Sequence, residues 1–237
     1  MKLRYITFTG IDERTDIDRL ERIQQQYPYA EFGVLLSYDW EDNGCRFPNP
    51  EIVGRLAYHH LNLSAHLCGK MAVELVQGYG TGPVAMCKGY FNYFSRCQLN
   101  LRAEGWFNEL RTKTFAPIDC KEVIVQMHTP DLLREFLTEA CPQNMSFLMD
   151  ASGGAGVDTP IEIVTSPGVS MGYAGGIGPD NVESKLRTLL EHDSDDEFWI
   201  DMETRVRTTD DEGEWLDLDK VEQVLEICDP IIKQYAE

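Results

Sequence analysis

The sequence has no long apolar run and no excess of basic residues. No window approaches 18 uncharged apolar residues, so no membrane-spanning helix is predicted. Lys and Arg together number 21 against 40 Asp and Glu, which gives a net charge of -19. Nucleic acids and anionic membranes both bind basic surfaces, so neither is expected as a partner.

Clustered cysteines are also missing. None of the seven cysteines belongs to a Cys-x-x-Cys pair or a tight Cys/His group, so no structural zinc site is expected. An odd number without regular spacing fits a reducing compartment better than a disulfide framework. The N-terminal residues enter a strand-like segment and lack a signal-peptide core. These features together predict a cytoplasmic protein.

The acidic residues are concentrated in two short segments, His192–Glu197 and Asp210–Glu214. Both are typical of solvated loops rather than of metal sites. An anionic substrate would therefore need a local positive site to overcome an unfavourable overall field.

Short apolar runs alternate with amphipathic helical segments along the chain. The predicted strands are Leu3–Phe8, Phe32–Leu36, Leu61–Leu67, Cys97–Leu101, Val123–Met127, Ser146–Met149, Val169–Tyr173 and Phe198–Met202. The predicted helices are Asp16–Gln25, Pro50–His59, Lys70–Gln77, Glu104–Lys113, Pro130–Ala140, Pro179–Glu191 and Leu216–Tyr235. Ala151–Pro167 has the composition of a loop where a sixth helix would stand.

Strands separated by helices indicate a parallel sheet covered by helices. Eight such units in 237 residues predict an α/β fold, a single-domain (β/α)8 TIM barrel over residues 1–237. A doubly wound open sheet is the alternative. It is not favoured, because no dinucleotide-type Gly-x-Gly-x-x-Gly follows the first strand.

One glycine-rich turn, within Tyr173–Val182, is the most informative motif. Gly175, Gly176 and Gly178 have no Cβ, so their N–H groups can lie directly against a ligand. A helix with Pro179 at its first position would point its positive dipole end at the same place, which suits phosphate. The alternative is a strand-to-helix turn that needs positive φ angles.

The catalytic face of a TIM barrel lies at the carboxyl ends of its strands. The residues predicted there are Thr9, Ser37, His66, Asn100, His128, Asp150, Gly175 and Asp201. Asp150 follows an apolar strand and precedes the flexible segment Ala151–Gly156. Burial at such a rim would raise the pKa of the carboxyl and suit a general acid. The alternative is an aspartate that caps the loop amides.

Several segments, taken in order, resemble phosphoribosylanthranilate isomerases. They are Thr9–Asp12, Cys45–Glu51, Met149–Gly156, Ala174–Val182 and Ile200–Asp201. The resemblance implies a barrel enzyme of tryptophan biosynthesis that carries out an Amadori rearrangement of a phosphoribosyl amine. It implies a small phosphorylated substrate and neither a cofactor nor a metal.

The resemblance also implies roles for single residues. Asp150 matches the general acid, and Arg46 matches the arginine that meets the substrate carboxylate. Asn100 and His128 are further candidates for substrate binding. The implied phosphate-binding residues are Gly175, Gly176, Gly178, Thr204 and Arg205.

The chain departs from this family at three places. Thr9 stands where the family has its basic cysteine, and a threonine hydroxyl has no accessible basic form near pH 7. Asn100 replaces a histidine, and Glu203 lies in the second half of the phosphate site. A base elsewhere is therefore required, and the candidates are His66, Cys68, His128 and Asp201.

Two other functions remain open. One is a different phosphosugar isomerase, epimerase or lyase on the same barrel, with His66 or His128 as base. The other is a protein that binds a phosphorylated ligand or a partner without catalysis. Its contacts would involve the acidic loops and the aromatic residues Tyr90, Phe91, Tyr93 and Phe94. A homodimer is left open as the oligomeric state.

Overall fold

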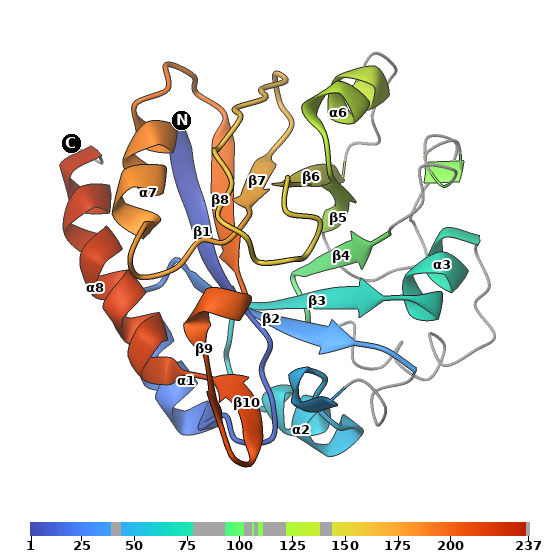
Figure 1. Ribbon diagram of the computed structural model, residues 1–237, viewed down its shortest axis with the longest axis vertical. Coiled ribbons are helices and arrows are strands. Elements are labelled where there is room, and N and C mark those ends of the chain that lie inside the picture. Colours follow the sequence, from blue (N-terminus) through green and yellow to red (C-terminus); the bar gives the residue numbers. More distant parts are fainter. Residues whose placement is uncertain are drawn as a thin grey trace.

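The computed structural model describes residues 1–38, 44–77, 93–101, 106, 109–110, 122–137 and 144–235. Eight parallel strands close into a barrel in chain order, and β1 pairs with both β2 and β8 (Figure 1). The strands are β1 (Lys2–Thr9), β2 (Ala30–Leu36), β3 (Leu63–Cys68), β4 (Arg96–Asn100), β5 (Glu122–Met127), β6 (Met145–Asp150), β7 (Met171–Ala174) and β8 (Glu197–Met202). This arrangement confirms the predicted (β/α)8 barrel class.

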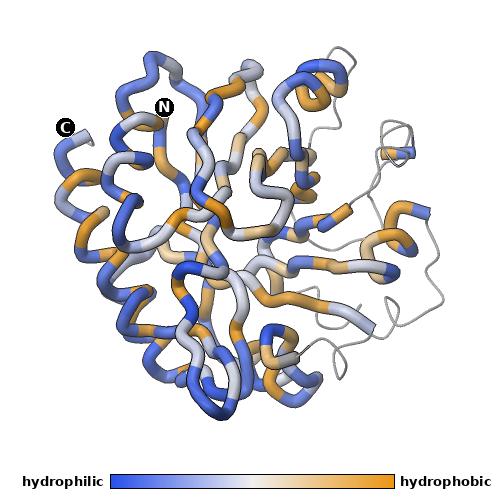
Figure 2. The backbone as a smooth tube through the Cα atoms, viewed as in Figure 1, coloured by the Kyte–Doolittle hydropathy of each residue, from blue (hydrophilic) through white to orange (hydrophobic). Residues whose placement is uncertain are grey.

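Helices surround the strands. They are α1 (Ile17–Gln26), α2 (Pro50–Leu56), α3 (Lys70–Gln77), α6 (Pro130–Leu137), α7 (Val182–Leu190) and α8 (Leu218–Tyr235). In α1, the side chain of Asp16 accepts a hydrogen bond from the N–H of Arg19 and caps the helix start, while Ile17 and Leu20 are buried. Orange and blue alternate along the helices in Figure 2, as expected for amphipathic segments. Among the described residues, no helix has the length and apolarity needed to cross a membrane.

Most of the apolar core lies between the barrel and its helices. A separate small cluster of Ile124, Leu148 and Trp199 comes from β5, β6 and β8 and fills part of the barrel interior. A Cβ on Gly172 would lie 2.2 Å from Cε2 of Trp199, so glycine on β7 makes room for the indole. The rest of the interior is unusually polar, because the interior layers of this fold normally consist of branched apolar side chains.

Arg96, the first residue of β4, organises the interior layer that lies toward the amino ends of the strands. Its Nε and Nη2 atoms donate to Glu31 at 2.8 and 2.5 Å, and Nη2 lies 3.3 Å from the hydroxyl of Thr7. The guanidinium group also stacks over the ring of Trp199 at 4.3 Å. These contacts cross the barrel from β4 to β1, β2 and β8, and they form a layer beneath the carboxyl ends of the strands.

A hairpin after β8 was not predicted. It consists of β9 (Arg207–Asp210) and β10 (Gly213–Leu216), where the sequence indicated a solvated acidic loop. The prediction of a loop over Asp210–Glu214 was wrong, because polar strands with little alternation give no period-two signal. The last helix consequently starts at Leu218 rather than Leu216, because Leu216 pairs with Arg207.

Two further predictions need correction. Pro179 is not the first residue of α7, which begins at Val182, and it lies instead in the preceding turn. The helix predicted over Pro50–His59 ends at Leu56.

Several predictions fall on residues that the structure does not describe. Most of the helix predicted over Glu104–Lys113 lies outside the described residues, as do Tyr90 and Phe91. Of the other two aromatic residues, Tyr93 is exposed and Phe94 is buried. The segment Ala151–Pro167 has no helix, as predicted.

Candidate functional site

A cavity of about 700 Å³ opens at the carboxyl ends of the barrel strands. Its walls contain all the predicted site residues except Gly178. These are Thr9, Arg46, His66, Asn100, His128, Asp150, Gly175, Gly176, Asp201, Thr204 and Arg205. The volume is that of a typical pocket for a small molecule.

Burial raises the pKa of two neighbouring acids at this cavity, Asp201 near the end of β8 and Glu203 just after it. Asp201 is buried, and its Oδ1 atom accepts a hydrogen bond of 2.9 Å from the hydroxyl of Thr9. Burial raises the pKa of Asp201 to about 8, and the hydrogen bond from Thr9 opposes this shift only in part. The other carboxyl oxygen receives no hydrogen bond within the described residues. Asp201 can therefore exchange a proton near neutral pH.

His66 on β3 lies in the same wall. Its Cε1 atom and the hydroxyl of Thr9 both pack over Gly33, where a Cβ would be 3.1 Å from the ring carbon and 2.4 Å from the oxygen. Burial lowers the pKa of His66 to about 3, and the positive charge of Arg96 adds to the effect. The imidazole is therefore neutral at pH 7, which makes it a weak base but a competent hydrogen-bond partner.

Asp150 holds the loop that follows β6. Its Oδ1 atom accepts from the N–H and the hydroxyl of Ser152 at 3.1 and 2.6 Å. Its Oδ2 atom accepts from Gly154 N–H at 2.7 Å and from the side chain of Gln126 at 2.9 Å. These hydrogen bonds fit the alternative given for Asp150, an aspartate that caps the amides of the following loop. Its role as a general acid stays a prediction.

The remaining strand-end residues form a polar wall on β3 to β5. Asn100 accepts from the side-chain amide of Gln98 at 2.9 Å and donates to the sulfur of Cys68 at 3.3 Å. His128 is half-buried, with Nδ1 3.4 Å from the carbonyl oxygen of Asp150. Cys68 also lines the cavity, so this wall offers groups that can hydrogen-bond a polyhydroxylated ligand.

The glycine turn after β7 packs tightly against the loop from β6. Gly175 and Gly176 have φ angles of 112° and 60°. A Cβ on Gly176 would lie 2.4 Å from the backbone nitrogen of Asp158, and one on Gly175 would lie 2.3 Å from the hydroxyl of Thr159. Positive φ and close approach both require glycine, so the alternative explanation of the motif accounts for these two residues.

Three consecutive N–H groups of this turn are nevertheless available. In the part of the chain that the structure describes, no acceptor faces the N–H of Gly175, Gly176 or Ile177. The N–H of Gly178, by contrast, donates to the side chain of Asn181 at 2.9 Å. Gly178 therefore belongs to the turn that starts α7 and is not brought to the cavity.

The turn after β8 lies beside the glycine turn. A Cβ on Gly178 would be 2.6 Å from Cβ of Arg205, and one on Gly156 would be 2.7 Å from Cβ of Thr204. Arg205 donates to the carbonyl oxygen of Gly176 at 2.9 Å and to Asp180 at 2.7 Å. Both predicted halves of the phosphate site are thus adjacent, but the charge of Arg205 is partly neutralised.

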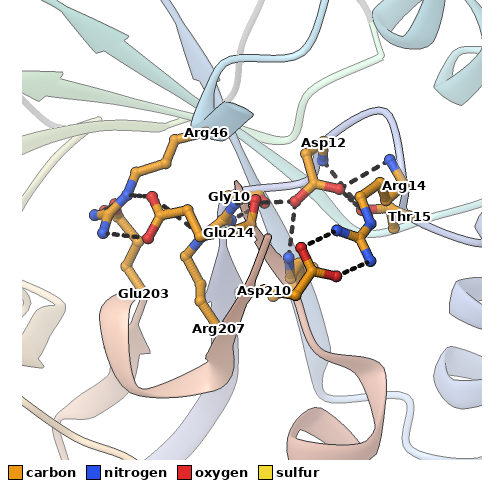
Figure 3. Close-up of polar contacts among 10 residues, drawn as sticks. Gly10, Asp12, Arg14, Thr15, Arg46, Glu203, Arg207, Asp210 and Glu214 are labelled. Carbon is orange, nitrogen blue, oxygen red and sulfur yellow. Dashed lines mark hydrogen bonds and ion pairs between the residues drawn. The ribbon is translucent and has the colours of Figure 1, made fainter. Parts of the chain in front are cut away.

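Arg46 is held by two carboxylates. Its Nη1 atom donates to Glu203 at 2.7 Å, while Nε and Nη2 form a bidentate pair with Glu214 (Figure 3). The bond to Arg46 lowers the pKa of Glu214. The predicted partner of a substrate carboxylate is therefore already paired within the chain.

Three residues of the site were not identified from the sequence. Gln98 stands two positions before Asn100 on β4. Gln126 on β5 stands two positions before His128, which directly follows that strand. Because side chains on a strand alternate between its faces, this spacing could have placed both glutamines in the interior. Glu214 gave no such signal, since its position depends on the hairpin.

Among the residues that the structure describes, no cluster of metal-ligating side chains lines the cavity. Among the described residues, Asp18, Glu21 and His59 form the one group with metal-ligand atoms within 4.8 Å of one another. None of the three lines the cavity, and His59 is occupied by a 3.0 Å contact with Glu21. Exposed acidic groups of this kind are ordinary surface features.

The chain matches no protein-family model, and no curated protein sequence matches it. The functional proposal therefore depends on the arrangement of the cavity and on the motif resemblance.

Proposed function

We propose that this barrel is an acid–base enzyme that isomerises a small phosphorylated sugar by moving a proton between adjacent carbons. The observation that supports this proposal most strongly is the state of the carboxyl group of Asp201. It is buried at the end of β8, one oxygen is fixed by Thr9, and burial raises its pKa to about 8. A proton-transfer group works best when its pKa lies close to the operating pH.

Asp201 thus takes the role of base that Thr9 cannot fill. In its ionised form it removes the proton from C2 of the open-chain sugar and returns it to C1, while the proton of the C2 hydroxyl moves to the C1 oxygen. Thr9 positions the carboxylate through the 2.9 Å hydrogen bond. Neutral His66, in the same wall, supplies a hydrogen bond to a sugar oxygen rather than positive charge.

The phosphate end of the substrate is assigned to the glycine turn. Gly175, Gly176 and Ile177 line the cavity together with Thr204, and among the described residues their N–H groups make no hydrogen bond. Backbone N–H groups bind phosphate without requiring a positive side chain. This matters in a chain with a net charge of -19.

The anthranilate half of the substrate is not part of the proposal. Arg46 would have to leave Glu203 and Glu214 before it could bind a substrate carboxylate. The proposed reaction class therefore keeps the phosphosugar and the proton transfer, and phosphoribosyl anthranilate is one compound to be tested.

The proposal is tested by proton exchange in D2O. The protein is incubated with ribose 5-phosphate, glucose 6-phosphate or phosphoribosyl anthranilate, and ¹H NMR follows loss of the C2 proton signal. We expect exchange with at least one of these compounds and a loss of at least about a hundredfold in Asp201→Asn, the lower range for a catalytic acid or base.

The matched control is Asp195→Asn, which removes an exposed carboxylate outside the cavity. It should exchange at the wild-type rate. If no compound exchanges, or if Asp201→Asn exchanges as fast as the control, the proposed function is wrong. Binding of phosphate without exchange would instead favour a non-catalytic ligand-binding protein.

A further inference from the structure

Every hydrogen-bonding nitrogen of Arg46 faces a carboxylate of the chain itself. Glu214 takes Nε and Nη2, and Glu203 takes Nη1 at 2.7 Å. In Figure 3 the guanidinium group of Arg46 lies between these two acids. We call Arg46, Glu203 and Glu214 the Arg46 triad. Glu214 also lies 3.7 Å from Nε of Arg207. Burial raises the pKa of Glu203, and the charge of Arg46 opposes this shift.

The hairpin that delivers Glu214 is firmly anchored. Arg207 on β9 is buried, donates to the carbonyl oxygen of Gly10 at 2.6 Å and pairs with Asp12 at 3.0 Å. Asp12 also accepts from the N–H of Leu216 on β10 at 2.7 Å. Since both strands of the hairpin are fixed to the loop after β1, Glu214 is held in place against Arg46.

The Arg46 triad forms part of the cavity rim. Arg46 and Glu203 both line the cavity, and Glu203 directly follows the β8 strand that carries Asp201. Only one oxygen of Glu203 is engaged by Arg46, and only one oxygen of Asp201 is engaged by Thr9. No donor among the described residues reaches the other oxygen of either acid. Within the described ranges, this side of the cavity therefore offers hydrogen-bond acceptors and no unpaired cationic side chain.

We infer that Glu203 and Glu214 are specificity-determining residues. They prevent Arg46 from binding a substrate carboxylate, and they select substrates that carry a hydrogen-bond donor. The selected substrate is a sugar phosphate that presents an amine or a hydroxyl to the remaining carboxyl oxygens of Glu203 and Asp201. An amine is preferred over a hydroxyl, because an ammonium group forms stronger hydrogen bonds with carboxylate oxygens. This inference rests on the proposed function, which places the phosphate at the glycine turn.

Three probes that share a 6-phosphate test the inference. At C1 of the same open chain, 1-amino-1-deoxyglucitol 6-phosphate presents an amine, glucitol 6-phosphate a hydroxyl and 6-phosphogluconate a carboxylate. Isothermal calorimetry should give the tightest Kd for the amine and the weakest for the carboxylate, with an overall difference of at least about tenfold. That is the range expected for one hydrogen bond to a charged group.

The double variant Glu203→Gln, Glu214→Gln frees Arg46 while conserving shape. It should bind 6-phosphogluconate at least about tenfold more tightly than the wild type and lose the preference for the amine. The control is Asp210→Asn. It removes one carboxylate from the same hairpin, where Asp210 pairs with Arg14 at 3.0 Å outside the cavity. This control should keep the wild-type order of affinities.

Two failures are distinguishable. If the wild type binds the three phosphates equally, or prefers 6-phosphogluconate, or if the double variant keeps the wild-type order, the selectivity inference is overturned. If none of the probes binds, and inorganic phosphate does not raise the unfolding temperature, the phosphate site fails and the proposed function fails with it. Circular dichroism verifies that both variants are folded.

Discussion

Replacement of the buried Arg96 tests how the barrel interior is held together. Arg96 is 1% exposed, and Glu31, its bidentate partner, is fully buried. In Arg96→Met the carboxylate of Glu31 would keep only the hydroxyl of Thr7 as a partner. Glu122, the second acid near Arg96, would keep its 2.7 Å ion pair with Arg4. The variant therefore leaves one uncompensated charge inside the barrel.

Breaking a buried ion pair by removing one partner typically costs about 3 to 5 kcal/mol. We expect Arg96→Met to lose that much free energy of unfolding. The double variant Arg96→Met, Glu31→Leu removes both charges and keeps similar volumes, so we expect a loss of no more than about 1 kcal/mol. The interaction energy between the two sites should therefore be several kcal/mol.

Equilibrium unfolding in urea, followed by tryptophan fluorescence, measures both variants. Trp199 lies against Arg96, so its emission also reports on the layer. The single variant Glu31→Leu, measured in the same way, completes the cycle. We would abandon this prediction if Arg96→Met cost less than about 1 kcal/mol, or if the double variant cost the sum of Arg96→Met and Glu31→Leu.

Three further predictions concern the cavity. Asp201→Asn should stabilise the fold by at least about 1 kcal/mol at pH 8 to 9 but not at pH 4. A carboxyl group with a raised pKa makes the stability of the wild type fall as pH rises from about 4 to about 8. Equal urea midpoints of variant and wild type at both pH values would contradict this. Gly176→Ala should cost at least about 2 kcal/mol more than Gly69→Ala and abolish phosphate-linked stabilisation in thermal unfolding. Both glycines have φ near 60°, but only at Gly176 does a Cβ meet backbone, so equal costs would be contrary to the packing argument. Asp150→Ala should increase amide hydrogen exchange over residues 152–154, and unchanged exchange would show that the carboxylate does not hold this loop.

Much of the fold could be predicted because its signal is local. Each of the eight apolar runs became a barrel strand, with ends displaced by no more than a few residues, since buried parallel strands are short continuous apolar segments. Their order along the chain then fixed which ends face the cavity. This is why Thr9, His66, Asp150 and Asp201 meet in one cavity, as predicted.

The pairing of charges could not be predicted in the same way. Arg46 and Glu214 are 168 residues apart in the chain, and their contact depends on a hairpin whose polar strands carry no periodic signal. The interior position of Arg96 is equally hidden, because an arginine at the start of a strand normally indicates exposure. Tertiary contacts, rather than local pattern, decide which charges of the chain are free.

The pH dependence of proton exchange tests the role of Asp201 most directly. We predict that the exchange rate at limiting substrate rises with pH to a plateau, with an inflection at about 8, because the base must be ionised. In Asp201→Asn the residual rate should show no such inflection. A wild-type rate that is flat between pH 6.5 and 9, or an inflection that survives in Asp201→Asn, would contradict the account.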